Sequence, residues 1–222
     1  MEQKKILICS YRNWANSVKD FIFLNYQDCD LTWIQSKAEF KEKAKGKTYD
    51  LALFIGWSWI VPKNFISRNT CVCFHPSDLP KYRGGSPIQN QIIDGLTESK
   101  VTAFKMDFGI DTGPIFGKEK ISLQGCLSNV LDSIEYASKM LAQRLLDACI
   151  DNSLCFYKQD ESQASVCTRR KPEQSEITIN DILSCTSLQL HNKIRSLQDP
   201  YPNAYVVCGD GKRLYIKMSD IE

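Results

Sequence analysis

Short apolar segments that alternate with helical patterns constrain the fold of this chain more than any other feature of its sequence. Residues 51–56 (LALFIG) and 70–75 (TCVCFH) are almost continuously apolar, as in strands that are buried on both faces of a sheet. Residues 4–10 (KKILICS) and 31–34 (LTWI) predict two earlier strands, and a helical pattern follows each of them. The alternation predicts an α/β fold with a mainly parallel sheet.

The pattern changes after residues 127–150, whose long apolar periodicity predicts a helix. Farther on, a helical pattern over 186–197 predicts another helix, and a D-G dipeptide between two apolar segments predicts a hairpin. We therefore predict a first domain over residues 1–150 and a small C-terminal α+β subdomain over residues 151–222, with the two parts packed together.

Composition and charge disfavour several classes of partner. The chain has 222 residues, of which 43% are hydrophobic and 24% charged, as in ordinary globular proteins. Its formal net charge of +2 lacks the strong basic bias of most nucleic-acid binders. No apolar run reaches the ~18 residues of a membrane span, and the N-terminal apolar stretch is too short for a signal peptide. We expect a cytoplasmic protein that binds neither nucleic acid nor membrane.

The ten cysteines are scattered and include no C-x-x-C motif, and only two histidines are present to complete a mixed metal site. Most of these cysteines have apolar neighbours, where a thiol behaves as a small hydrophobic group. Cys71 and Cys73 would share one face of a strand, an arrangement typical of packing. We predict reduced core cysteines and no metal site.

The first predicted strand is followed by Ser10, Tyr11, Arg12 and Asn13, so the motif G-x-G-x-x-G is absent there. The motif G-x-x-x-x-G-K-[ST] is absent as well. The sheet is Rossmann-like in its pattern but lacks the glycines that cradle phosphates in dinucleotide and NTP sites. A dehydrogenase, a flavoenzyme or an NTPase is therefore disfavoured.

Two segments that follow predicted strands carry chemically useful side chains. His75 ends one strand and precedes a loop rich in proline and glycine. Residues 101–106 (VTAFKM) predict another strand, and the segment that follows contains Asp111 before a strand-like run at 115–123. If both segments lie at the ends of sheet strands, His75 and Asp111 form a general base and the carboxylate that orients it. The residues alone also fit plain structural roles, because aspartate is common in turns.

The sequence H-P-S-D-L-P-K-Y-R-G beginning at His75, together with G-I-D-T-G-P-I around Asp111, resembles the folate-dependent formyltransferases. That family includes methionyl-tRNA, glycinamide ribonucleotide and nucleotide-sugar formyltransferases, and the resemblance covers most of residues 1–150. It implies the formyltransferase fold, with N10-formyltetrahydrofolate as co-substrate and no metal. In that family the histidine acts in proton transfer and the aspartate supports it, and these roles carry to His75 and Asp111.

The resemblance also implies which residues hold the folate. They belong to the backbone after an upstream strand, to the glycine-rich loop and to the turn before Asp111. These residues are Trp59, Ile60, Val61, Gly84, Gly85, Asp107, Phe108 and Gly109.

One departure from the family pattern concerns the oxyanion. The family usually has Asn-x-His, whose asparagine amide donates to the developing negative charge, whereas this chain has Cys73 at that position. A thiol is a weak donor. Asn90 could supply the missing amide, or protonated His75 could stabilise the oxyanion; we favour these two together. The alternatives are a degraded member that binds folate without catalysis and a Cys73 nucleophile that carries a formyl thioester.

The expected acceptor is a nucleotide-linked amino sugar. The sequences of residues 83–90 (RGGSPIQN) and 169–177 (RRKPEQSEI) resemble short sugar N-formyltransferases and the formylation domains of peptide synthetases. The alternatives are a carrier-bound aminoacyl group and Met-tRNA, which the short, nearly neutral chain disfavours because RNA binding depends on positive charge. Arg12 and residues 169–171 are candidates for acceptor phosphates, and the C-terminal hairpin could form the edge of a homodimer.

Overall fold

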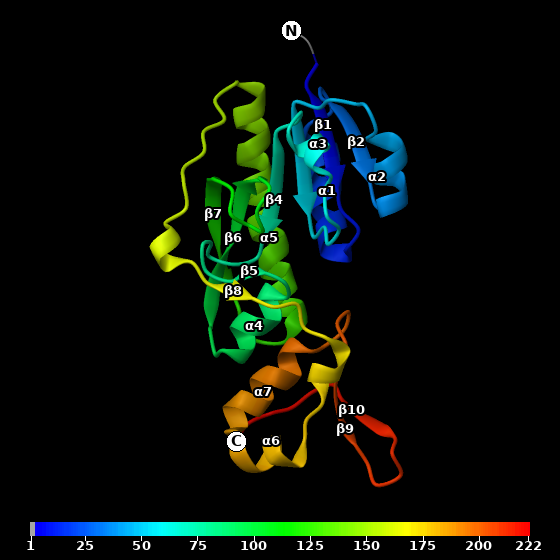
Figure 1. Cartoon of the computed structure of the whole chain (residues 1–222), viewed down its shortest axis with the longest axis vertical. Coiled ribbons are helices and arrows are strands. Elements are labelled where there is room, and N and C mark those ends of the chain that lie inside the picture. The colour runs from blue at the N-terminus through cyan, green and yellow to red at the C-terminus, as the bar shows by residue number, and fades with distance from the viewer. Residues whose placement is uncertain (1–2) are drawn as a thin grey trace.

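The computed structural model describes residues 3–222 and is built on a six-stranded sheet, shown in Figure 1. The strand order is β2-β1-β3-β4-β6-β7. The strands are β1 (Lys5–Cys9), β2 (Asp30–Ile34), β3 (Leu51–Ile55), β4 (Cys71–His75), β6 (Glu98–Lys105) and β7 (Ile115–Ser122). The pairs among β2, β1, β3 and β4 are parallel, so the prediction of an α/β fold with a mainly parallel sheet is confirmed.

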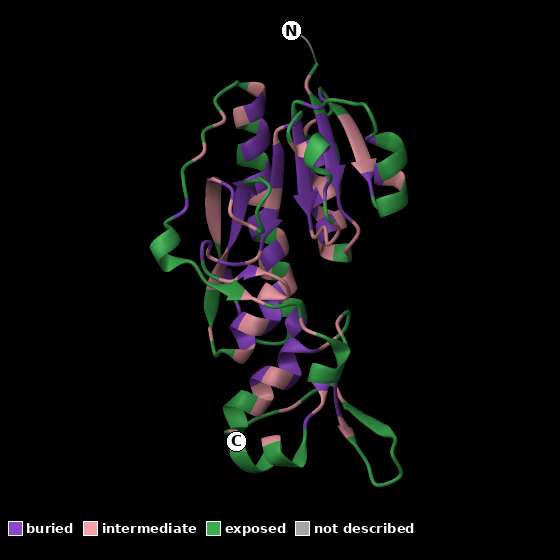
Figure 2. Cartoon of the chain, viewed as in Figure 1, coloured by how far each residue is buried: buried purple, intermediate pink, exposed green. Residues whose placement is uncertain are grey.

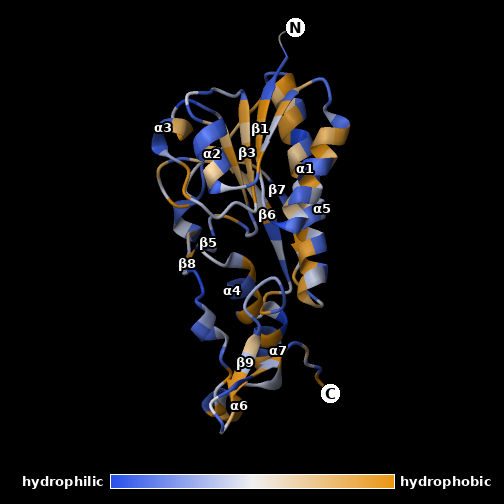
Figure 3. Ribbon diagram, turned by 90° about the vertical axis from the view of Figure 1, so that its right-hand side faces the viewer, coloured by the Kyte–Doolittle hydropathy of each residue, from blue (hydrophilic) through white to orange (hydrophobic). Residues whose placement is uncertain are grey.

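Helices cover both faces of this sheet, as the side view in Figure 3 shows. One face packs against α1 (Asn13–Asn25), α4 (Pro87–Ile93) and α5 (Leu127–Ile150). The other face packs against α2 (Lys37–Lys43) and α3 (Lys63–Ile66). Alternate side chains of each strand enter the two cores, and Figure 2 shows the central strands buried along their length. This burial explains the continuous apolar runs.

The strand β6 runs antiparallel to β4, with His75 opposite Thr102 and Val72 opposite Lys105. We reasoned above that His75 and Asp111 would come together because each follows the end of a sheet strand. That reason is wrong here, since β6 is antiparallel to β4 and ends beside the start of β4. The connecting helix α4 is only seven residues long, about 10 Å. It does not return the chain to the other edge, so β6 starts where β4 ends.

The helix α5 forms over Leu127–Ile150, as predicted. Its apolar side chains recur at helical spacing and face the sheet, where Ile134, Leu141 and Leu145 are fully buried. At its N-terminus the Asn129 side chain accepts from the backbone N–H of Cys126, 3.1 Å away, which satisfies a donor that the helix leaves free.

After α5 the chain returns along the sheet as an extended segment, residues 151–168, which we call the strap; Figure 1 shows it in yellow. The strap contains η1 (Glu161–Gln163) and β8 (Val166–Cys167), and β8 pairs in parallel with β5 (Arg83–Gly84). The strap therefore packs on the part of the chain predicted as the first domain. The division at residue 150 stays a prediction.

The remaining residues form the small α+β unit at the bottom of Figure 1. Its elements are η2 (Pro172–Ser175), α6 (Ile179–Ser184), α7 (Ser187–Ser196), β9 (Ala204–Val207) and β10 (Arg213–Ile216). The last two strands form the predicted hairpin. Arg195 ties this unit to the first, because its guanidinium donates to the carbonyls of Leu123 (2.6 Å) and Gly125 (3.1 Å).

Two expectations about what the fold lacks can be compared with residues 3–222. Within that range, no helix combines the length and apolar character that a membrane crossing needs. Within the same range, no group of three or more histidine, cysteine or acidic side chains is arranged to hold a metal ion.

Truncating a core side chain of α5 tests this packing. Leu141→Ala should lower the free energy of unfolding by about 2–5 kcal/mol, because it leaves a cavity against the sheet. Tyr136→Ala on the same helix, at a side chain 67% exposed, should change it by less than ~0.5 kcal/mol. Urea unfolding measures both, and equal losses for the two variants would contradict the assigned face of α5.

Candidate active site

His75 is the last residue of β4 and is only 6% exposed. Its Nε2 lies 2.8 Å from the carbonyl oxygen of Tyr82. Because a carbonyl can only accept, Nε2 carries a proton in this arrangement. The lone pair of the neutral ring is then on Nδ1, which lies 3.5 Å from Oδ2 of Asp111. The structure thus brings the predicted base and its carboxylate together.

Asp111 reaches His75 by a route that the strand pattern does not reveal. The chain leaves β6 opposite Val72 and folds back across the sheet before β7 begins at Ile115. At Asp111 the backbone is left-handed, with φ of 55°, which is uncommon outside glycine. The Oδ2 atom of Asp111 also accepts from the backbone N–H of Gly84 at 2.8 Å, so the carboxylate is fixed from two sides.

Gly84 is approached closely by the strap, and Gly85 by Arg169, which follows the strap. A Cβ atom on Gly84 would lie 2.4 Å from the carbonyl oxygen of Cys167. One on Gly85 would lie 2.6 Å from Cα of Arg169. Only glycine tolerates such contacts. The glycines therefore admit backbone from a distant part of the chain, and their role in holding folate stays a prediction.

Cys73 lies two residues before His75 and on the same face of β4. It packs with Leu79, Phe104 and Ile115. Burial raises the pKa of the Cys73 thiol well above its usual range, and the charge of Asp111 raises it further. Cys73 is therefore a neutral thiol at pH 7, which argues against a Cys73 nucleophile because the thiolate is the reactive form.

The side-chain amide of Asn90 is engaged within the protein. Its nitrogen donates to the carbonyls of Ser86 (3.0 Å), Gly85 (3.2 Å) and Thr168 (3.2 Å). These contacts join α4 to the strap and use the two amide protons. The role of Asn90 as an oxyanion donor stays a prediction and would require it to exchange one of these partners.

The segment after β3 offers free main-chain groups beside an aromatic cluster. Among the backbone–backbone hydrogen bonds of residues 3–222, none involves Trp59, Ile60 or Val61. Ile60 is 95% exposed and Val61 is buried, while the Trp59 ring lies 4.5 Å from that of Tyr11. A flat heterocycle with donors and acceptors on its edge, such as the pterin of folate, fits free amides beside exposed apolar side chains.

The loop that follows β6 is held by its own side chains. Asp107 accepts from the backbone N–H of Gly109 (3.0 Å) and from the hydroxyl of Thr112 (2.8 Å). Phe108 is exposed, and the ammonium of Lys63 lies 5.4 Å from its ring centre. That contact places Phe108 beside α3, which follows residues 59–61 in the chain. The role of these two loops in binding folate stays a prediction.

Residues 19–148, more than half of the chain, match the family described as Formyl transferase. The chain belongs to the formyl transferase family. The methionyl-tRNA formyltransferase of Lachnospira eligens is 31% identical over 186 residues, 82% of this chain and 57% of that protein. That of Campylobacter curvus is 33% identical over 162 residues, with shares of 72% and 51%. The chain spans about half the length of these curated relatives.

Solved structures of the formyl transferase family share this fold. A methionyl-tRNA formyltransferase from Clostridium thermocellum has a TM-score of 0.78 at 33% identity, covering 95% of this chain and 96% of that one. A 4-N formyltransferase from Francisella tularensis has a TM-score of 0.80 at 20% identity, with coverages of 98% and 99%. The second likeness shows the fold alone. Together these matches confirm the predicted formyltransferase fold and the family resemblance.

Three residues in the hydrogen-bond network that supports Asp111 were not predicted as site residues. Gln159 donates to the carbonyl of Asp111, Arg83 donates to Gln159, and Glu161 pairs with Arg83. Arg83 stands within the motif that begins at His75, so its position offered a signal. Gln159 and Glu161 lie in a polar segment without periodicity, which gave none.

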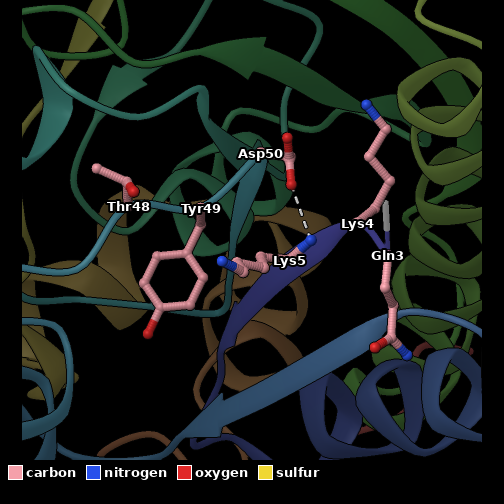
Figure 4. A pocket seen from close by; sticks show the side chains of 6 residues that line it. All are labelled: Gln3, Lys4, Lys5, Thr48, Tyr49 and Asp50. Atoms are coloured by element: carbon pink, nitrogen blue, oxygen red, sulfur yellow. Dashed lines mark hydrogen bonds between the residues drawn. The ribbon is translucent and has the colours of Figure 1, made fainter. Parts of the chain in front are cut away.

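Two hollows on the molecule do not include His75 in their linings. One of about 310 Å³ lies at the amino ends of β1 and β3, where Lys5, Tyr49 and Asp50 line it (Figure 4). Another of about 620 Å³ lies near the amino ends of β3 and β4, and Asp107 and Phe108 line part of it. His75 lines neither hollow. We therefore place the candidate active site at the carboxyl end of β4, where His75 lies.

Thiol reactivity tests the environment of Cys73. Cys126 is exposed, and hydrogen bonding from Ser128 lowers its thiol pKa, whereas burial raises that of Cys73. A lowered pKa increases the thiolate fraction at pH 8, and a raised one removes it. Iodoacetamide at pH 8 should therefore modify Cys126 early and spare Cys73, as peptide mass spectrometry would measure. Modification of Cys73 in the folded protein at the rate of Cys126 would contradict this account.

Proposed function

We propose that this chain transfers a formyl group from N10-formyltetrahydrofolate to a primary amine. The observation that carries the proposal is the contact of Nδ1 of His75 with the Asp111 carboxylate at 3.5 Å, in a chain that belongs to the formyl transferase family. An amine must lose a proton as it attacks a formyl carbon, and the leaving nitrogen must gain one. One imidazole can serve both needs.

The geometry supports a specific path for the proton. The Tyr82 carbonyl keeps a proton on Nε2 of His75, so Nδ1 is the atom that accepts a proton from the amine. Asp111 then stabilises the charged ring and fixes its orientation. General catalysis of this kind contributes ~10²–10⁴-fold, and holding the two reactants in contact contributes much of the remaining rate enhancement.

Stabilisation of the oxyanion is assigned to His75 rather than to Cys73. The neutral Cys73 thiol is a weak donor. Once protonated, the His75 ring carries a positive charge beside the reacting carbon. To donate a charge-assisted hydrogen bond to the oxyanion, one of its N–H groups would have to turn from Tyr82 or Asp111. The amide of Asn90 would add to this only after leaving its carbonyl partners.

The folate would be held by the loops that follow β3 and β6. The free main-chain groups of Trp59, Ile60 and Val61 would bind the edge of its heterocycle, with Gly84, Gly85 and the turn Asp107–Gly109 completing the site. When bound, the folate supplies the activated formyl group, and the chain's own residues supply binding, orientation and the proton at His75.

The acceptor that we propose is a nucleotide-linked amino sugar. The net charge of +2 supports a small anionic acceptor over a long polyanion. Arg12 lies at the carboxyl edge of the sheet, with its guanidinium 5.2 Å from the ring centre of Tyr11 and 5.3 Å from that of Tyr201. An arginine held in this way is a candidate to bind a phosphate.

Met-tRNA is the second candidate acceptor. The observation that favours it is the identity of 31–33% to methionyl-tRNA formyltransferases, against 20% to a 4-N formyltransferase of similar fold. Binding of Met-tRNA, a long polyanion, would depend more steeply on salt concentration than binding of a small nucleotide sugar. The salt dependence of the reaction therefore separates the two acceptors.

Removing the proposed base or its carboxylate tests the mechanism. His75→Asn should lower kcat by ~10²–10⁴-fold, and Asp111→Asn by about 10–100-fold, as for other groups that orient a histidine. The KM for the folate should change little, because neither side chain is assigned to bind it. Release of tetrahydrofolate measures the rate. The matched control is His191→Asn at the only other histidine, and a loss there equal to that of His75→Asn would contradict the assignment.

A panel of acceptors tests the substrate. With N10-formyltetrahydrofolate present, nucleotide-linked amino sugars should be formylated with a kcat/KM at least about tenfold above that for Met-tRNA, a difference of ~1.4 kcal/mol. Mass spectrometry of the product gives the site of formylation. Faster formylation of Met-tRNA would overturn the sugar acceptor while leaving formyl transfer intact.

A further inference from the structure

Gln159 is the one buried residue in a polar stretch of the strap. Its neighbours Lys158 and Asp160 are exposed, whereas Gln159 is only 9% exposed. A glutamine amide has two donor protons and two acceptor positions, and burying any of them without a partner is costly. Its surroundings must therefore satisfy the whole amide.

All four hydrogen-bonding positions of this amide are used. The nitrogen of Gln159 donates to the carbonyl of Asp111 (2.8 Å) and to that of Gly113 (2.7 Å). Its oxygen accepts from Nη2 (2.7 Å) and Nε (3.2 Å) of Arg83. The side chain thus joins the loop that carries Asp111 to the loop that follows His75.

The two carbonyls held by Gln159 belong to the turn that presents the catalytic carboxylate. Asp111 has left-handed backbone, a conformation that costs free energy unless the surroundings impose it. Gly113 lies so close to the end of β6 that a Cβ atom there would be 1.8 Å from the carbonyl of Lys105. Gln159 fixes the turn from the other side.

Arg83 anchors Gln159 in turn. Its guanidinium is almost buried and forms two hydrogen bonds of 2.7 and 2.8 Å with Glu161. This pairing raises the pKa of Arg83 and lowers that of Glu161. A fork of this kind fixes both direction and distance, so the oxygen of Gln159 cannot rotate away from Arg83 and its nitrogen stays directed at the turn.

We propose that Gln159 is a positioning residue, which holds the Asp111 backbone so that its carboxylate faces Nδ1 of His75. The proposal rests on the proposed function for its kinetic part, because it assigns Asp111 to catalysis. The amide of Gln159 bonds to the backbone of Asp111 and Gly113 and to Arg83, not to His75. It therefore acts through Asp111.

The test is Gln159→Glu, which keeps the shape of the side chain and its contact with Arg83. It replaces the donor nitrogen by an oxygen facing two carbonyl oxygens, so the turn should move. We expect kcat to fall about 10–100-fold, with the KM for folate within about twofold of the original. Gln163→Glu makes the same chemical change at an exposed position of the strap and should leave kcat unchanged. Gln159→Met, which removes the donor without adding charge, should repeat the loss.

A double-mutant cycle shows whether Gln159 acts through Asp111. In an Asp111→Asn background, Gln159→Glu should cost less than about twofold in kcat, because the positioned carboxylate is already gone. A full additional loss in that background, or near-normal kcat in both Gln159 variants, would overturn the proposal.

A readout without activity separates this proposal from the proposed function. The chain has only His75 and His191, so ¹⁵N-histidine NMR gives two resolvable rings. At one fixed pH, Gln159→Glu and Asp111→Asn should shift the His75 ring nitrogens in the same direction, while Gln163→Glu should not and His191 should stay unmoved. Unchanged His75 resonances in Gln159→Glu would overturn the positioning role. Inactivity of the unmodified protein on every amine would overturn only the proposed function.

Discussion

The arrangement of the site depends on the backbone N–H of Gly84, which donates to Oδ2 of Asp111 at 2.8 Å. That bond ties the loop after β4 to the loop between β6 and β7. His75 enters the same group through its 3.5 Å contact with Asp111. Apart from the two-residue β5, both loops are irregular, so neither would hold its side chain in place alone. The hydrogen bonds between them take the place of regular secondary structure.

The strap stabilises this group of loops from outside. The strand β8 pairs with β5, and Gln159 and Glu161 contact Arg83. The strap, which follows α5 in the sequence, thus packs directly against the candidate site. The close approach of the strap and of Arg169 also gives a structural reason for the two glycines after Arg83. The proposed binding and catalysis would therefore draw on the same few contacts that stabilise these loops.

Much of the sheet and its helices could be predicted from the sequence because periodicity and burial are local signals. The long helix was predicted with the boundaries Leu127–Ile150, and the four parallel strands from their apolar runs. The direction of β6 was not, since it depends on how far the seven-residue α4 carries the chain. The contact of His75 with Asp111 was predicted from a family motif, although the reason based on strand ends was wrong. Gln159 was missed because its partners lie 48 and 76 residues away.

The most direct test of the central claim is a crystal structure with a formyl-bearing folate analogue that cannot transfer its group. The account predicts the heterocycle on the main chain of residues 59–61 and the formyl group within about 3–4 Å of the His75 ring, the reach of direct proton transfer or one close contact. A folate bound elsewhere, or bound with its formyl group remote from His75 and Asp111, would contradict it.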